Sequence, residues 1–249
     1  MMGSLIKFIA ERLPEHTPAP CELAQSYFST PSQKVSPLLK KTVASVFNAE
    51  RPSDYDYLDI NAAQELISTG APRLCYDGIV FVSNRHVSKS GREISLVACA
   101  NPHNRINYRT LIAYAEVRDM AQCAEAASHT TQEGGPGHHF PGSVGVIEFE
   151  ITPRGKRIIV NYIQASFHPK KAFERDLLPK EMVRAYSAWP IVSLGKLFSS
   201  AKDLGTEDIF LPYSAVLNGL ETERIDQIAQ KFGFERGKDA SVYTAKPSS

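Results

Sequence analysis

The pattern of apolar and polar positions changes near Pro72. Residues 1–70 hold short apolar stretches at helical spacing, separated by prolines, and the last of them predicts a helix from Asn61 to Ile67. Residues 71–249 instead carry runs rich in Val, Ile and aromatic residues between turn signals. We therefore predict a helical N-terminal extension over 1–70 and one α+β domain over 71–249.

Two β-hairpins are predicted within the second part. The first joins residues 74–86 and 92–100 through Ser88-Lys89-Ser90-Gly91. The second joins residues 144–152 and 157–167 through a Pro-Arg-Gly-Lys turn. In residues 157–167 the apolar residues occupy both faces, which is typical of an interior strand. Simple alternation places Ile158, Val160 and Tyr162 on one face and Ile159 and Ile163 on the other.

Between the hairpins, residues 105–127 show apolar positions at helical spacing and predict a long helix. After Pro169 the pattern is helical again, with a helix over 191–204 that ends at Gly205. The remaining elements are a short buried strand, a helix that ends before Gly233, and final strands; they are predicted at 208–211, 222–232, 234 and 240–245.

Composition narrows the class of protein. Hydrophobic residues make up 43% and charged residues 22% of 249, as is typical of a globular chain. The 28 Lys and Arg nearly balance 27 Asp and Glu, so we expect no general attraction to nucleic acid. No apolar run approaches the roughly 20 residues needed to cross a bilayer. The four cysteines are widely spaced without a C-x-x-C pair, which favours buried free thiols and a cytoplasmic location.

A loop rich in glycine, proline and histidine follows the predicted long helix. Residues 130–142 include Gly-Gly-Pro-Gly-His-His, and for this segment we expect weak packing, high mobility and a lid-like position over a cleft. Adjacent His138 and His139 point to opposite sides of an extended loop, so a metal site is not expected. We assign His139 and Glu148 as candidate general bases. The alternative for Glu148 and Glu150 is that they are exposed polar residues on the solvent-facing side of a strand.

The order of elements in the last third is a long strand, a Pro-containing basic loop, a helix, a short strand, a helix, and a Gly-Phe pair that starts a strand. The sequences that follow this order are Ala165-Ser-Phe-His-Pro-Lys-Lys-Ala-Phe173, Ala201-Lys-Asp-Leu-Gly205 and Ile225-Asp-Gln-Ile-Ala-Gln-Lys-Phe-Gly-Phe-Glu235. In this respect, over roughly residues 157–245, the chain resembles the GNAT superfamily of acyl-CoA N-acyltransferases. The resemblance implies a mixed, mainly antiparallel sheet of about seven strands flanked by helices.

The resemblance further implies acyl transfer from acetyl-CoA to an amine of a small molecule or a protein. The residues implied for cofactor binding are Phe167, His168, Lys170, Lys171 and Arg175, because cations at a helix start favour a pyrophosphate. Ala172 and Phe173 stand near the family's paired glycines, and Ala229 stands where many members have a tyrosine. These differences favour the alternative, a non-catalytic domain of the same fold that binds a protein or a small ligand.

Overall fold

The computed structural model of the chain describes residues 60–69, 73–74, 79–87, 91–100, 108–131, 135–152, 156–211 and 222–246. The helix predicted from Asn61 to Ile67 is present as α4 (Ile60–Thr69). The remainder of the predicted N-terminal extension, residues 1–59, lies outside the described residues.

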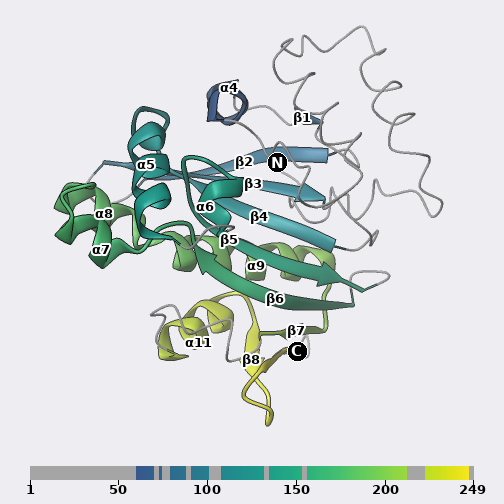
Figure 1. Cartoon of the computed structure of the whole chain (residues 1–249). Helices are drawn as coiled ribbons and strands as arrows, with labels where there is room; N and C mark the ends of the chain where they lie inside the picture. Colours follow the sequence, from purple (N-terminus) through teal and green to yellow (C-terminus); the bar gives the residue numbers. More distant parts are fainter. Residues whose placement is uncertain are drawn as a thin grey trace, which may run out of the picture.

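One sheet of nine strands organises the described part of the chain (Figure 1), in the spatial order β1-β2-β3-β4-β5-β6-β7-β9-β8. All neighbouring strands are antiparallel except β6 and β7, which are parallel. The expected α+β class with a mixed, mainly antiparallel sheet is therefore confirmed. The strands are β1 (Arg73–Leu74), β2 (Ile79–Val87), β3 (Glu93–Ala100), β4 (Tyr108–Tyr114), β5 (Ser143–Ile151), β6 (Arg157–Ala165), β7 (Asp208–Phe210), β8 (Phe234–Arg236) and β9 (Val242–Ala245).

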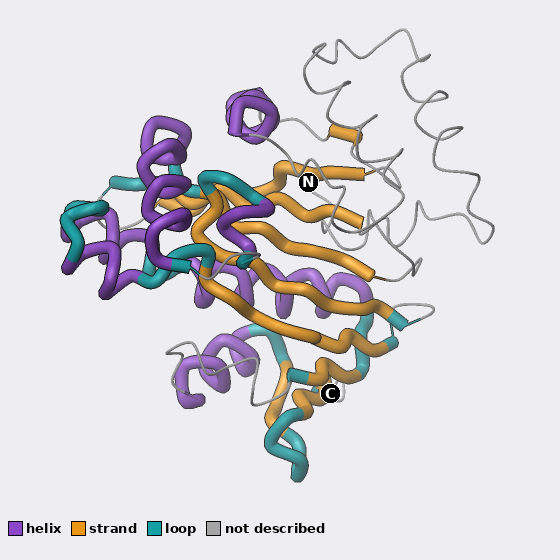
Figure 2. Tube along the Cα trace, viewed as in Figure 1, coloured by secondary structure: helices purple, strands orange, loops and turns teal. Residues whose placement is uncertain are grey.

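Helices cover both faces of this sheet (Figure 2). Helices α5 and α6 pack on one face over β5, whereas α9 packs on the other face against β4 and β5. Helix α11 packs on α9 and β8, and α7 and α8 follow the end of β6. The helices after α4 are the 3-10 helix η2 (Val117–Asp119), α5 (Met120–Thr130), α6 (Pro136–His139), α7 (Pro169–Glu174), α8 (Lys180–Tyr186), α9 (Trp189–Leu204) and α11 (Thr222–Lys231).

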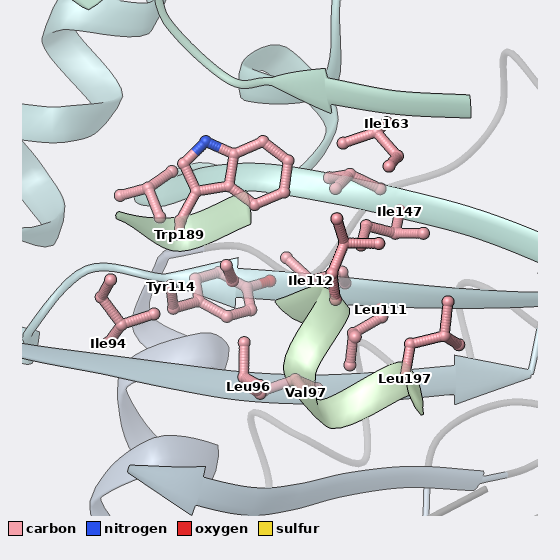
Figure 3. Packing of buried hydrophobic residues seen from close by; sticks show 14 of the residues in the cluster. Ile94, Leu96, Val97, Leu111, Ile112, Tyr114, Ile147, Ile163, Trp189 and Leu197 are labelled. Atoms are coloured by element: carbon pink, nitrogen blue, oxygen red, sulfur yellow. The ribbon is translucent and has the colours of Figure 1, made fainter. Parts of the chain in front are cut away.

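A continuous apolar core fills the space between the sheet and α9. Figure 3 shows Trp189 and Leu197 of α9 beside Leu111, Ile147 and other strand residues. These side chains have lost nearly all contact with water, and burial of this kind is the main force that holds a helix on a sheet. The position of α9 is therefore fixed by its apolar stripe.

The long helix predicted over residues 105–127 is wrong in its first half. Residues 108–114 form β4, which pairs with β3 on one side and β5 on the other. Leu111 to Ala115 are all buried, so this apolar run fills both faces of an interior strand. Helical structure begins only at Val117. Pairing on both sides, favoured by the aromatic and β-branched residues of β4, outweighs the helical spacing of the apolar positions.

The interior position predicted for residues 157–167 is confirmed only at Ile158 and Ile159, which pair with β5 on one side and β7 on the other; residues 160–165 pair with no described strand on the side of β7. The predicted faces are wrong beyond Val160. The ladder pairs Val160 with Phe149 and Tyr162 with Glu148, so Asn161 has no partner on β5. This β-bulge moves Ile163 to the face of Ile158 and Val160, and the three are buried. Tyr162 is half-buried on the opposite face.

The weak packing predicted for residues 130–142 is also wrong for part of that segment. Residues 136–139 form α6, in which Pro136 and Gly137 are buried. A Cβ on Gly137 would stand 2.3 Å from the carbonyl oxygen of Ser166 and 2.5 Å from the Cβ of Ala127. Helix α6 is therefore held tightly between α5 and the end of β6.

None of the helices in the described residues is long and apolar enough to cross a membrane.

Candidate functional site

The parallel strands β6 and β7 stay together for only three residue pairs. Arg157, Ile158 and Ile159 pair with Asp208, Ile209 and Phe210. Strand β6 then continues to Ala165, and no described strand pairs with residues 160–165 on the side of β7. Strand β7 itself ends at Phe210, so beyond Ile159 this side of β6 has no partner among the described strands. Clefts outside the carboxyl ends of adjacent parallel strands are preferred places for ligands, and an unpaired strand edge can accept an extended ligand.

A carboxylate and a phenol face each other on the same stretch of sheet. Glu148 of β5 and Tyr162 of β6 are direct cross-strand partners, and the Tyr162 hydroxyl donates a hydrogen bond to the Glu148 carboxylate. Both residues are half-buried, so the pair remains accessible to a ligand. Gly145 of β5 faces Trp189 of α9. Because side chains alternate along β5, Glu148 lies on the opposite face of the sheet, which α5 and α6 cover.

The other candidate base, His139, is the last residue of α6. Helix α6 packs on β5 and β6, so the backbone of His139 lies on the same two strands as the Glu148–Tyr162 pair. The side chain of His139 lies outside the described part of the structure.

The residues implied for cofactor binding divide into two groups. Phe167 is only 4% exposed and belongs to the core, where it has no surface for a ligand. His168, Lys170, Lys171 and Arg175 are exposed on or beside α7. The structure thus brings four of the five candidates together at the carboxyl end of β6.

Several of these four groups already have partners within the chain. His168 caps α7: its Nδ1 accepts a hydrogen bond from the Lys171 N–H at 3.3 Å. Pro169 carries no N–H, so two backbone donors at the start of α7 are unavailable to a ligand. The Arg175 guanidinium donates to the carbonyl oxygen of His129 at 2.8 Å, and the Lys170 ammonium lies 3.7 Å from Glu174.

A solvent-open hollow of about 420 Å³ lies between α7 and α8. Three cationic side chains, Lys170, Lys180 and Arg184, line this hollow. The aromatic ring of Phe173, which is 48% exposed, lies beside them. Lys180 and Arg184 are four residues apart on α8 and so share one face, where two like charges repel each other. A phosphate between them would relieve that repulsion. The lining residues are Pro169, Lys170, Phe173, Lys180, Val183 and Arg184.

Lys180 and Arg184 are not among the site residues predicted from the sequence, although a local signal for them is present. Their spacing of four residues directly after Pro179 predicts two cations on one helical face. What could not be foreseen is that α8 turns this face toward Lys170 and Phe173.

A second cluster of ionisable groups is buried and tied within the chain. The Asp119 carboxylate accepts hydrogen bonds from the Arg92 guanidinium and the Tyr186 hydroxyl. Burial, and then the hydrogen bond to Asp119, raise the pKa of Tyr186. Burial also raises the pKa of the neighbouring Cys123 thiol far above its ordinary range, so Cys123 is not a nucleophile. This cluster stabilises the fold rather than forming a reaction centre.

Among the described residues, no group of three His, Cys, Asp or Glu side chains is placed to hold a metal ion. Cys123 is a free, buried thiol, as expected for it, whereas Cys21 and Cys75 and the side chain of Cys99 lie outside the description. No protein-family model matches the chain, and neither a curated protein nor a solved structure is significantly similar to it.

Proposed function

We propose that the chain is an acyl-CoA-dependent N-acyltransferase with a GNAT-like fold, which transfers an acetyl group to an amine of a small molecule or a protein. The observation that carries this proposal is the edge of β6 after Ile159, which no described strand covers on the side of β7. The pantetheine arm of coenzyme A is extended and contains amides, so it can pair with the open edge of β6. Its thioester then reaches the sheet near the bulge at Asn161.

The phosphates of coenzyme A would occupy the hollow between α7 and α8. Lys170, Lys180 and Arg184 supply three positive charges at the carboxyl end of β6, and the exposed ring of Phe173 offers a surface for the adenine. This arrangement assigns phosphate binding to side chains rather than to the backbone of α7, whose Lys171 N–H is taken by His168.

The reaction needs a base for the attacking amine. In our proposal the Glu148 carboxylate takes a proton from the acceptor ammonium, the amine nitrogen forms a bond to the thioester carbonyl carbon, and the carbon–sulfur bond breaks. The nitrogen loses its second proton to water, and the coenzyme A thiolate leaves with the electron pair and takes a proton from water. Tyr162 holds the carboxylate in place through its hydroxyl. His139 is the second candidate for the base.

Calorimetric titration with acetyl-CoA tests the cofactor site. Replacing Lys180 and Arg184 together by Ala removes two cations of the hollow, and each direct charge-assisted contact is worth roughly 1.5–3 kcal/mol, so the affinity falls at least about tenfold. Lys171→Ala is the matched control, because Lys171 lies on α7 but does not line the hollow. Equal affinity of the double variant and the wild type would contradict the phosphate site.

The alternative function is a non-catalytic domain of the same fold that binds a protein or a small ligand. Two features favour this alternative. His168 caps α7 and occupies the Lys171 N–H, and Ala172 and Phe173 stand in the place of glycines. The same titration decides between the two: absence of both heat and a thermal shift at millimolar acetyl-CoA would replace the enzyme by the binding domain. If acetyl-CoA binds, Glu148→Gln is expected to lower kcat about 10²–10⁴-fold while leaving acetyl-CoA affinity unchanged.

A further inference from the structure

Helix α9 carries two stripes of different character. The first is buried against the sheet and includes Leu194 and Leu197. The second consists of residues that are all half-buried and recur at helical spacing: Ala188, Ile191, Val192, Gly195, Lys196 and Ser199. On a helix that already buries one stripe, the remaining positions are expected to be polar. Ile191, Val192 and Gly195 depart from that pattern.

This second stripe forms one wall of a cavity of about 440 Å³. The other walls come from β2 and β3, through His86 and Leu96, and from the end of α11, through Ile228, Lys231 and Phe232. A volume of this size lies in the range of about 300–1,000 Å³ that is usual for sites of small organic ligands. Most of the lining side chains are apolar, as such sites require.

Gly195 provides an independent reason to expect a ligand in this cavity. It lies in the interior of α9, where glycine is a poorer helix former than alanine. A Cβ built on Gly195 would meet no atom within 4 Å, so packing within the described structure does not require glycine there. Close approach of a bound group to the helix backbone would account for glycine at this position.

The charges around the cavity are of one sign. Lys196, Lys231 and His86 are the ionisable residues of its lining, and no Asp or Glu belongs to it. Lys196 is half-buried. Burial lowers the pKa of its ammonium, and the negative charge of Asp203 offsets only part of that effect. An anion in the cavity would stabilise this partly desolvated charge.

We propose that the cavity between α9, α11 and β2–β3 binds a small amphipathic carboxylate. The apolar tail lies over Gly195 against Ile191, Val192 and Phe232, and the carboxylate lies between Lys196 and Lys231. The site is on the α9 face of the sheet, opposite to Glu148, so the proposal is independent of acyl transfer and of coenzyme A.

Titration calorimetry of the full chain with 4-phenylbutyrate tests the proposal, with neutral 4-phenylbutan-1-ol as the matched ligand. We expect heat of binding at millimolar 4-phenylbutyrate and at least about tenfold weaker binding of the alcohol. Lys196→Met is expected to weaken 4-phenylbutyrate binding at least about tenfold, whereas Lys196→Arg restores it. Lys202→Met is the control on α9, because Lys202 is exposed and outside the cavity.

Gly195→Leu tests the position of the tail. Its side chain is expected to fill the cavity and abolish binding while the circular dichroism spectrum and the melting temperature stay at or above those of the wild type. Gly195→Ala is expected to raise the melting temperature, by roughly 2–4 °C where the full propensity gain is realised. The proposal is overturned by any of three results: no heat with 4-phenylbutyrate, equal affinities of acid and alcohol, or unchanged binding by folded Gly195→Leu.

Discussion

The indole of Trp189 lies directly against the backbone of Gly145: a Cβ on Gly145 would stand 2.1 Å from the indole Cε2 and 2.2 Å from Cζ2. This contact joins the first turn of α9 to the middle strands of the sheet. Any side chain at position 145 would displace the ring. Glycine at this position therefore sets how closely α9 approaches β5.

We predict that Gly145→Ala lowers the free energy of unfolding by about 1–3 kcal/mol, because overpacking forces the indole out of its position. Gly195→Ala is the matched control on α9, with no atom within 4 Å of the new Cβ. Urea unfolding measures both. In a Trp189→Leu background the Gly145→Ala loss should shrink. An equal loss in both backgrounds would show that the Trp189–Gly145 contact is not its cause.

The Asp119 cluster gives a second prediction. Asp119→Ala removes the acceptor of both Arg92 and Tyr186, and breaking such a buried, charged arrangement costs about 3 kcal/mol or more. Tyr186→Phe alone should cost about 1.5–3 kcal/mol, because it removes the hydrogen bond donated to the Asp119 carboxylate and the one accepted from the Glu116 N–H. The double variant should cost less than the sum, since the two changes remove the same bond. Additive losses in urea unfolding would argue against this coupling.

The bulge in β6 predicts unequal effects of single-residue deletions. Deleting Asn161 leaves Val160 opposite Phe149 and Tyr162 opposite Glu148, so the ladder becomes regular and every other side chain keeps its face. We expect this variant to fold with a cooperative urea transition. Deleting Ile159 should instead abolish cooperative unfolding, because it shifts the register against both β5 and β7. The prediction fails if both deletions behave alike.

Tyr243 gives a prediction about alkaline pH. Burial, and then the hydrogen bond that its hydroxyl donates to Asp226, raise the pKa of Tyr243 to about 12, against about 10 in an unfolded chain. Between these two values the folded state binds more protons than the unfolded state, so the stability due to Tyr243 is complete below about pH 10 and declines as the pH rises toward about 12. The stability difference between the wild type and Tyr243→Phe should therefore narrow over that range. Urea unfolding at about pH 9 and about pH 11.5 measures it, and a constant difference would contradict the shifted pKa.

Local patterns in the sequence predicted many elements of the fold. The hairpin expected at 74–86 and 92–100 is present as β2 and β3, and the helix expected at 191–204 begins two residues earlier, at Trp189. Turn residues and helix ends depend on neighbours in the chain, which is why they could be foreseen. The bulge at Asn161 and the strand at Tyr108–Tyr114 depend on pairing with β5 and β3, which periodicity within one segment does not report.

For the candidate sites, too, groupings of residues close in the sequence could be predicted, whereas groupings that depend on tertiary packing could not. The grouping of Lys170, Lys171 and Arg175 was foreseen because they are close in sequence. Of these three, only Lys170 lines the hollow, and the contribution of Lys180 and Arg184 to it depends on how α8 packs beside α7. The cavity over Gly195 combines residues from 86 to 232, and no local pattern brings these together.

Strand β9 is the last described strand in the sequence, yet it lies inside the sheet, between β7 and β8. During synthesis β7 and β8 are made before residues 242–245, so neither has its antiparallel partner until these residues follow. Until then both present open hydrogen-bonding edges, which are the usual starting points of misassembly on the ribosome and after it. Closure of this end of the sheet thus depends on a short segment that leaves the ribosome after both of its partners.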